Sequence, residues 1–146
     1  MNWYDDVLAG ATNTRFSSAR VGAYRVTLAR HNDGRFAIAL CSPNDAFNRR
    51  KGQAIAFRRL NDTNSLFACE YSRRNDYSFK RASGGEQALD AAYFIVQGCP
   101  DKFPLAFQNA LSVAMQRRDA RDAVKQRQQE EDDAWQRYDS MHPQGV

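Results

Sequence analysis

A repeating pattern of apolar residues around one turn constrains the fold of this chain most. Every second residue is apolar in 24–28 and again in 36–40, which is the period of a half-buried β-strand. Between these runs, the tetrapeptide His31–Gly34 contains Asn, Asp and Gly, which tolerate the positive φ angles of tight turns. The segment 24–40 is therefore predicted to be a β-hairpin.

Helix and strand signals occur on both sides of this hairpin. A capping residue or a proline before an apolar run predicts a helix start, and glycine after such a run predicts its end. Predicted helices follow Asn2, run from Ser42 to about Leu60, run from the Ser83–Glu86 capping box to Gly98, and begin again after Asp101. Predicted strands are one or two within 15–30, and one each at 66–72 and 77–82.

Together these elements predict an α+β fold. We expect a largely antiparallel sheet of four or five strands, two helices packed on one face of it, and a long charged C-terminal helix. Large apolar residues become sparse after Gln116, so we expect a globular domain over 1–116 and an extended charged helix or tail over 117–146. No sustained heptad is present in that tail.

The tail carries three residues that favour a contact with another molecule: Trp135, Tyr138 and Met141. Two interpretations follow. Either the segment is a solvated helix held by charge pairs four residues apart, or these three side chains form a partner-binding helix, through which the chain could pair with itself.

The sequence favours a cytoplasmic protein that does not enter membranes. No apolar run approaches the roughly 18 residues of a membrane span, and the first ten residues carry two acids where a leader would carry basic ones. Cys41, Cys69 and Cys99 are odd in number and widely spaced, which fits a reducing compartment and buried structural thiols.

Charge is divided unevenly along the chain. Residues 15–81 contain fourteen Lys or Arg and five Asp or Glu, a net charge of +9, whereas the whole chain carries only +4. Twelve of these fourteen cations are Arg, which forms forked contacts to phosphate or carboxylate and stacks on flat rings. This segregation favours a polyanionic or acidic partner, with nucleic acid or a nucleoprotein complex as the leading class.

Two clusters of cations are the candidate binding residues. The predicted helix 42–60 has no acid between Asp45 and Asp62, and it supplies Arg49, Arg50, Lys51, Arg58 and Arg59. The alternative is the solvated face of an ordinary amphipathic helix. A predicted second hairpin supplies Arg73, Arg74, Lys80 and Arg81, interleaved with aromatic residues on which bases could stack. The alternative there is a strand pair with buried aromatics and a basic tip.

Enzymatic functions find little support in the sequence. The two histidines, His31 in a turn and His142 in the tail, are too few for a zinc site, and no CxxC motif exists. A metal-dependent nuclease would have to use acids of no recognisable spacing: Asp62, Glu70, Asp76 and Glu86. We predict no catalytic residue, no metal site and no cofactor.

One stretch resembles a known group of proteins. A strand ending in Cys-Ser-Pro-x-Asp-x-Phe, followed by Arg-Lys-Gly, Ile-Ala and Arg-Leu, covers Cys41 to Leu60. It resembles a segment of small uncharacterised phage and prophage accessory proteins. The resemblance implies a phage origin and an early accessory role on host machinery, in the cytoplasm of the host cell. It transfers no catalytic residue.

These observations lead to three expected functions. The first is a non-enzymatic, phage-encoded protein that inhibits or modulates a host defence or transcription complex by occluding it with a basic surface. The second is a structural or assembly protein that pairs through its C-terminal helix. The third is a protein that binds DNA or RNA directly.

Overall fold

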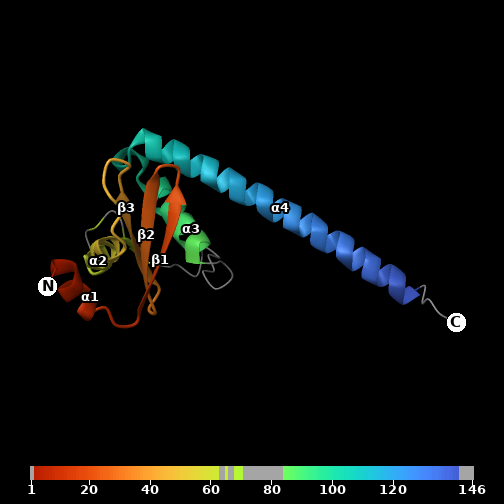
Figure 1. Cartoon of the computed structure of the whole chain (residues 1–146), viewed down its shortest axis with the longest axis horizontal. Coiled ribbons are helices and arrows are strands. Elements are labelled where there is room, and N and C mark those ends of the chain that lie inside the picture. The colour runs from red at the N-terminus through yellow and green to blue at the C-terminus, as the bar shows by residue number, and fades with distance from the viewer. Residues whose placement is uncertain (1, 63–64, 66–67, 71–83, 142–146) are drawn as a thin grey trace. The chain divides into compact units, whose positions relative to one another are not determined.

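The computed structural model describes residues 2–62, 65, 68–70 and 84–141, and it shows an α+β fold (Figure 1). The chain divides into two compact units, Met1–Ser112 and Val113–Val146. In chain order the elements are α1 (Trp3–Ala9), β1 (Thr14–Val21), β2 (Tyr24–His31), β3 (Arg35–Cys41), α2 (Arg49–Leu60), β4 (Ala68–Glu70), α3 (Gly84–Gly98), the 3₁₀ helix η3 (Pro100–Lys102) and α4 (Leu105–Met141). Helix α4 begins in the first unit, and its residues from Val113 onward belong to the second.

The sheet is antiparallel, with strand order β1-β2-β3-β4. The predicted hairpin at 24–40 is confirmed as β2 and β3, which are joined by a turn ending at Gly34 with φ of 100°. Three of the four strands are long, whereas β4 has three residues. The predicted second hairpin falls mostly on residues 71–83, outside the part of the chain that the structure describes.

Helices α2 and α3 lie on opposite faces of the sheet (Figure 1). The prediction that both helices cover one face is therefore wrong. On the α2 face, Ala29 pairs with Ala37 in the antiparallel register. On the opposite face, the ring of Phe36 lies 6.0 Å from the ring of Phe94 in α3, measured between centroids. Since both faces are covered, four consecutive residues of β2, Val26 to Ala29, are buried.

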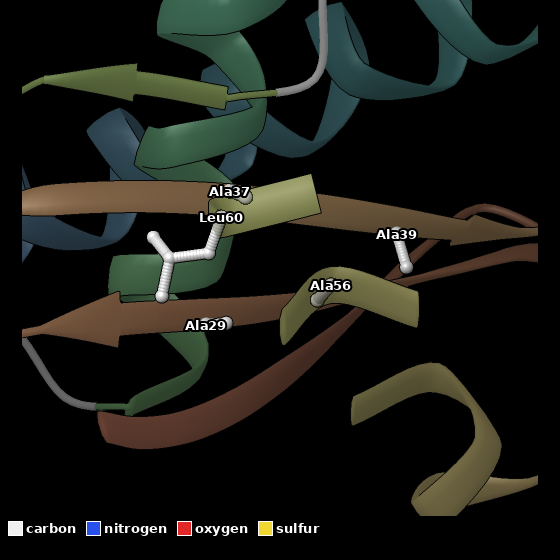
Figure 2. Close-up of a cluster of buried hydrophobic side chains, with 5 residues drawn as sticks. All are labelled: Ala29, Ala37, Ala39, Ala56 and Leu60. Atoms are coloured by element: carbon white, nitrogen blue, oxygen red, sulfur yellow. The ribbon is translucent and has the colours of Figure 1, made fainter. Parts of the chain in front are cut away.

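The buried centre of the α2 face of the sheet consists of alanines. Figure 2 shows Ala56 and Leu60 of α2 lying over Ala29, Ala37 and Ala39 of the sheet. Small residues on a sheet face let a helix backbone approach closely, and Gly52 lies at one such close contact. A Cβ atom placed on Gly52 would lie 2.8 Å from the Thr27 hydroxyl oxygen. The opposite face carries larger side chains, among them Leu28 and Ile38, which are also buried.

The first two turns of α4 complete the layer on the α3 side of the first unit. Phe107 and Leu111 are buried there, and the Phe107 ring lies 5.3 Å from the Tyr24 ring. Gly22, in the two-residue turn between β1 and β2, has φ of 60°, and a Cβ there would lie 2.9 Å from the Ala110 Cβ. Glycine therefore serves both the turn geometry and the close contact with α4.

Two helix starts differ from the prediction. Helix α2 begins at Arg49 because the Asn48 side chain accepts a hydrogen bond from the Lys51 N–H at 3.1 Å, whereas Ser42 and Asp45 form a turn before it. Helix α4 begins at Leu105, because residues 100–102 form a separate 3₁₀ turn. The predicted helices α1 and α3 are confirmed, although Ser83, the predicted cap of α3, lies outside the described residues.

Two further predictions concern the thiols and membranes. Cys41 and Cys99 are half-buried, whereas buried thiols were predicted. The Cys41 Sγ lies 3.7 Å from the backbone carbonyl oxygen of Ser42, and the Cys99 Sγ lies 3.5 Å from that of Ile95. The side chain of Cys69 is not described. None of the described helices combines the length and the apolar character that crossing a membrane would require.

We expect Gly52→Ala to lower the free energy of unfolding by about 1–3 kcal/mol, because the added methyl group overpacks the contact with Thr27. Urea denaturation followed by circular dichroism measures the change. Gly98→Ala is the matched control, since no atom lies within 4 Å of a Cβ placed there. Equal stability changes in the two variants would contradict the close approach of α2 to the sheet.

Candidate partner-binding surface

The five predicted cations of α2 occupy three different environments. Helix α1 packs against α2 and engages two of them. Arg50 donates from Nε to the Asp5 carboxylate at 2.6 Å, and the Arg58 guanidinium lies 4.4 Å from the centre of the Trp3 ring. Both arginines remain exposed, so α1 orients them without removing them from solvent.

Arg59 turns toward the sheet. Its Nη1 donates to the backbone carbonyl of Ile38 at 3.1 Å, and burial lowers the pKa of its guanidinium. Ile38 lies on β3 directly after Arg35–Ala37, the three residues that pair with β4. Arg59 therefore donates to a β3 carbonyl next to the end of the described β3–β4 pairing. A half-buried guanidinium in such a contact stabilises the fold more than it attracts a partner.

Arg49 and Lys51 are exposed in the first turn of α2, which contains no acid. Neither forms an ion pair with a described residue. Cations at a helix N-terminus add to the positive end of the helix dipole, so they disfavour the isolated helix and strengthen the local positive potential. This end of α2 is therefore suited to attract an anion.

Two further cations lie near this end of α2, and they were not among the predicted site residues. Arg20 and Arg25 are direct partners in the register of β1 and β2, on the same face as Thr27. The Arg25 guanidinium lies 4.6 Å from the centre of the ring of Phe47, which belongs to the loop before α2. The signal in the sequence is their symmetric placement about the Gly22–Ala23 turn, which forces the two side chains onto one face.

Two adjoining hollows are lined by three of these cations. The first has a volume of about 330 Å³ and is lined by Thr27, Lys51 and Gly52, among others. The second has a volume of about 290 Å³ and is lined by Arg20 and Arg25. Both hollows are also lined by Cys41, Asp45 and Phe47, which therefore form their shared wall. We define the basic surface as the three cations and the ring that line these hollows, together with Arg49 in the first turn of α2: Arg20, Arg25, Phe47, Arg49 and Lys51.

The remaining predicted site residues lie outside the described residues or in the second unit. Arg73, Arg74, Lys80 and Arg81 lie outside the described residues. Trp135, Tyr138 and Met141 lie in the second unit and are 61%, 52% and 75% exposed. Over residues 2–62, 65, 68–70 and 84–141, no group of three His, Cys, Asp or Glu side chains is placed to hold a metal ion.

Comparison with known proteins places the chain in no group: no family model, no curated protein and no solved structure matches it. The basic surface and the part of α4 in the second unit are the described features that bear on function.

We expect Arg59→Ala to lower the free energy of unfolding by about 1–3 kcal/mol, since it removes a charged donor from the backbone carbonyl of the buried residue Ile38. Arg49→Ala is the control in the same helix and should change stability by less than about 0.5 kcal/mol. Thermal and urea unfolding measure both variants. A larger loss for Arg49→Ala than for Arg59→Ala would contradict this division of the cations.

Proposed function

We propose that this chain is a non-enzymatic binding protein whose basic surface contacts the phosphates of a nucleic acid, bare or within a nucleoprotein complex. One observation carries the proposal. Three cations from β1, β2 and α2 (Arg20, Arg25 and Lys51) line two adjoining hollows, and neither they nor Arg49 in the first turn of α2 form an ion pair with a described residue. A cluster of this kind attracts phosphate and releases counterions when phosphate binds.

The energetics of the free protein support an anionic partner. Arg20 and Arg25 carry like charges at directly opposed positions of two strands, an arrangement that destabilises a sheet. Arg49 and Lys51 oppose the dipole of α2 at its N-terminus. Phosphate oxygens bound between these groups would relieve both costs, so the surface gains stability from a ligand that the fold alone does not supply.

Phe47 adds a second means of recognition. Its ring contacts the Arg25 guanidinium and forms part of the wall between the hollows. Aromatic rings beside cations bind single-stranded nucleic acids, because bases stack on the ring while the cations hold phosphates. We therefore expect single strands to bind at least as well as duplexes.

The biological role that we propose rests on the resemblance of Cys41–Leu60 to phage and prophage accessory proteins. That stretch includes Phe47, Arg49 and Lys51, three of the five residues of the basic surface. We propose a phage-encoded protein that acts in the host cytoplasm and inhibits a defence or transcription complex by occupying its nucleic-acid contacts. Direct binding to DNA or RNA without such a complex is the alternative.

The test is a titration of fluorescent single-stranded and double-stranded DNA and RNA oligonucleotides at rising salt, read by anisotropy. We expect affinity to fall steeply with salt, and Lys51→Ala to reduce the slope of log K against log salt by about 0.7–0.9, the value for one phosphate contact. Each lost contact should weaken binding to every sequence about equally.

Lys102→Ala is the matched control, because Lys102 is also exposed but lies in η3, outside the basic surface. It should leave the slope unchanged. A salt-independent affinity, or equal effects of Lys51→Ala and Lys102→Ala, would overturn the proposal.

A further inference from the structure

The second unit of α4 carries an apolar stripe with a regular spacing. Val113, Val124 and Trp135 are eleven residues apart and are 45%, 56% and 61% exposed. Eleven residues make about 20° more than three whole helical turns, so successive members are displaced by only about 20° around the helix. Tyr138 extends the stripe, since its ring lies 5.9 Å from the Trp135 ring in an edge-to-face contact.

The charges of this segment change sign along its length. Residues 113–127 contain five cations and two acids, whereas residues 128–141 contain five acids and one cation. The acids therefore lie toward the C-terminus of α4, whose last turn has no basic residue. Negative charge at that end opposes the helix dipole, so the distribution of charge does not stabilise a lone helix.

We propose that residues 113–141 bind the same segment of a second copy of this chain as an antiparallel helix pair. The two-fold axis passes beside Val124. Because Val113 and Trp135 are equally distant from Val124 in sequence, reversing one helix about Val124 places Val113 of each copy opposite Trp135 of the other. The stripe is thus complementary to itself, with a small side chain facing a large one.

The charges select the same direction and register. With Val124 at the axis, Arg117 of one copy faces Glu131 of the other, and both residues lie within about 20° of the stripe. A parallel pair would instead place the acidic run 130–133 of both copies side by side, and likewise the cations near 117–121. Like charges at facing helix positions destabilise the pair, so the antiparallel arrangement is favoured.

This pairing does not depend on the proposed nucleic-acid binding, because the two surfaces share no residue. It gives a specific form to the assembly function considered from the sequence. Each copy supplies both the apolar stripe and the complementary charges, so the second copy is the partner that the segment itself specifies.

The mass of the full-length chain in solution, measured by sedimentation equilibrium across a concentration series, tests the pairing. We expect a monomer–dimer equilibrium, with the dissociation constant raised roughly tenfold or more by Val124→Lys, which places two ammonium groups at the axis. Since Lys is a better helix former than Val, loss of the dimer would not reflect a weaker helix. Gln126→Lys adds the same charge about 200° around the helix and should leave the dimer intact.

Reversing the charge of Arg117 tests whether the two helices pair antiparallel or parallel. Arg117→Glu should weaken the antiparallel dimer by making both facing pairs repulsive, and the double variant R117E/E131R should restore it. In a parallel pair, Arg117 of one copy would face Arg117 of the other. Arg117→Glu would then replace one repulsive pair with another and leave the dissociation constant unchanged. A wild-type chain that is monomeric at every concentration, equal effects of Val124→Lys and Gln126→Lys, or no response to Arg117→Glu would each overturn the proposal.

Discussion

The close approach of α2 to the sheet is the contact on which the first unit depends. It requires that alanine occupies three sheet positions facing the helix and that Gly52 lies against Thr27. A larger side chain at any of these positions would push α2 outward. The Arg59 guanidinium would then lose Ile38, and the hollow between Lys51 and Thr27 would change shape. The small residues thus determine where the charged residues of α2 lie.

That geometry gives similar side chains different roles within one helix. Arg59 donates to the Ile38 carbonyl of β3, Arg50 and Arg58 contact α1 while staying exposed, and Arg49 and Lys51 form no ion pair with a described residue. The basic surface is completed from the strands, by Arg20 and Arg25. The net charge of a segment therefore overstates the charge available to a partner, because part of it is used within the fold.

The hairpin at 24–40 was predictable because a period of two and a turn sequence are local signals. The second covered face was not, because Thr27, Ala29, Ala37 and Ala39 resemble a weakly polar outer face until a helix is known to lie on them. Likewise Asn48 and Ser42 are both good helix caps, and only the structure shows which one is used. Contacts of Arg50 with Asp5, 45 residues apart, leave no local trace. The regular spacing in α4 was present in the sequence, but at eleven residues rather than seven.

The burial of β2 on both faces has a consequence for how the first unit opens. Val26 and Leu28 hold the layer containing α3, while Thr27 and Ala29 hold the layer containing α2, so alternate residues of one strand anchor both. If either helical layer detached, β2 would be exposed on that face, and the other layer packs on the same strand. The two layers therefore unfold as one cooperative element, and the amides of β2 should exchange with solvent only when the whole unit opens.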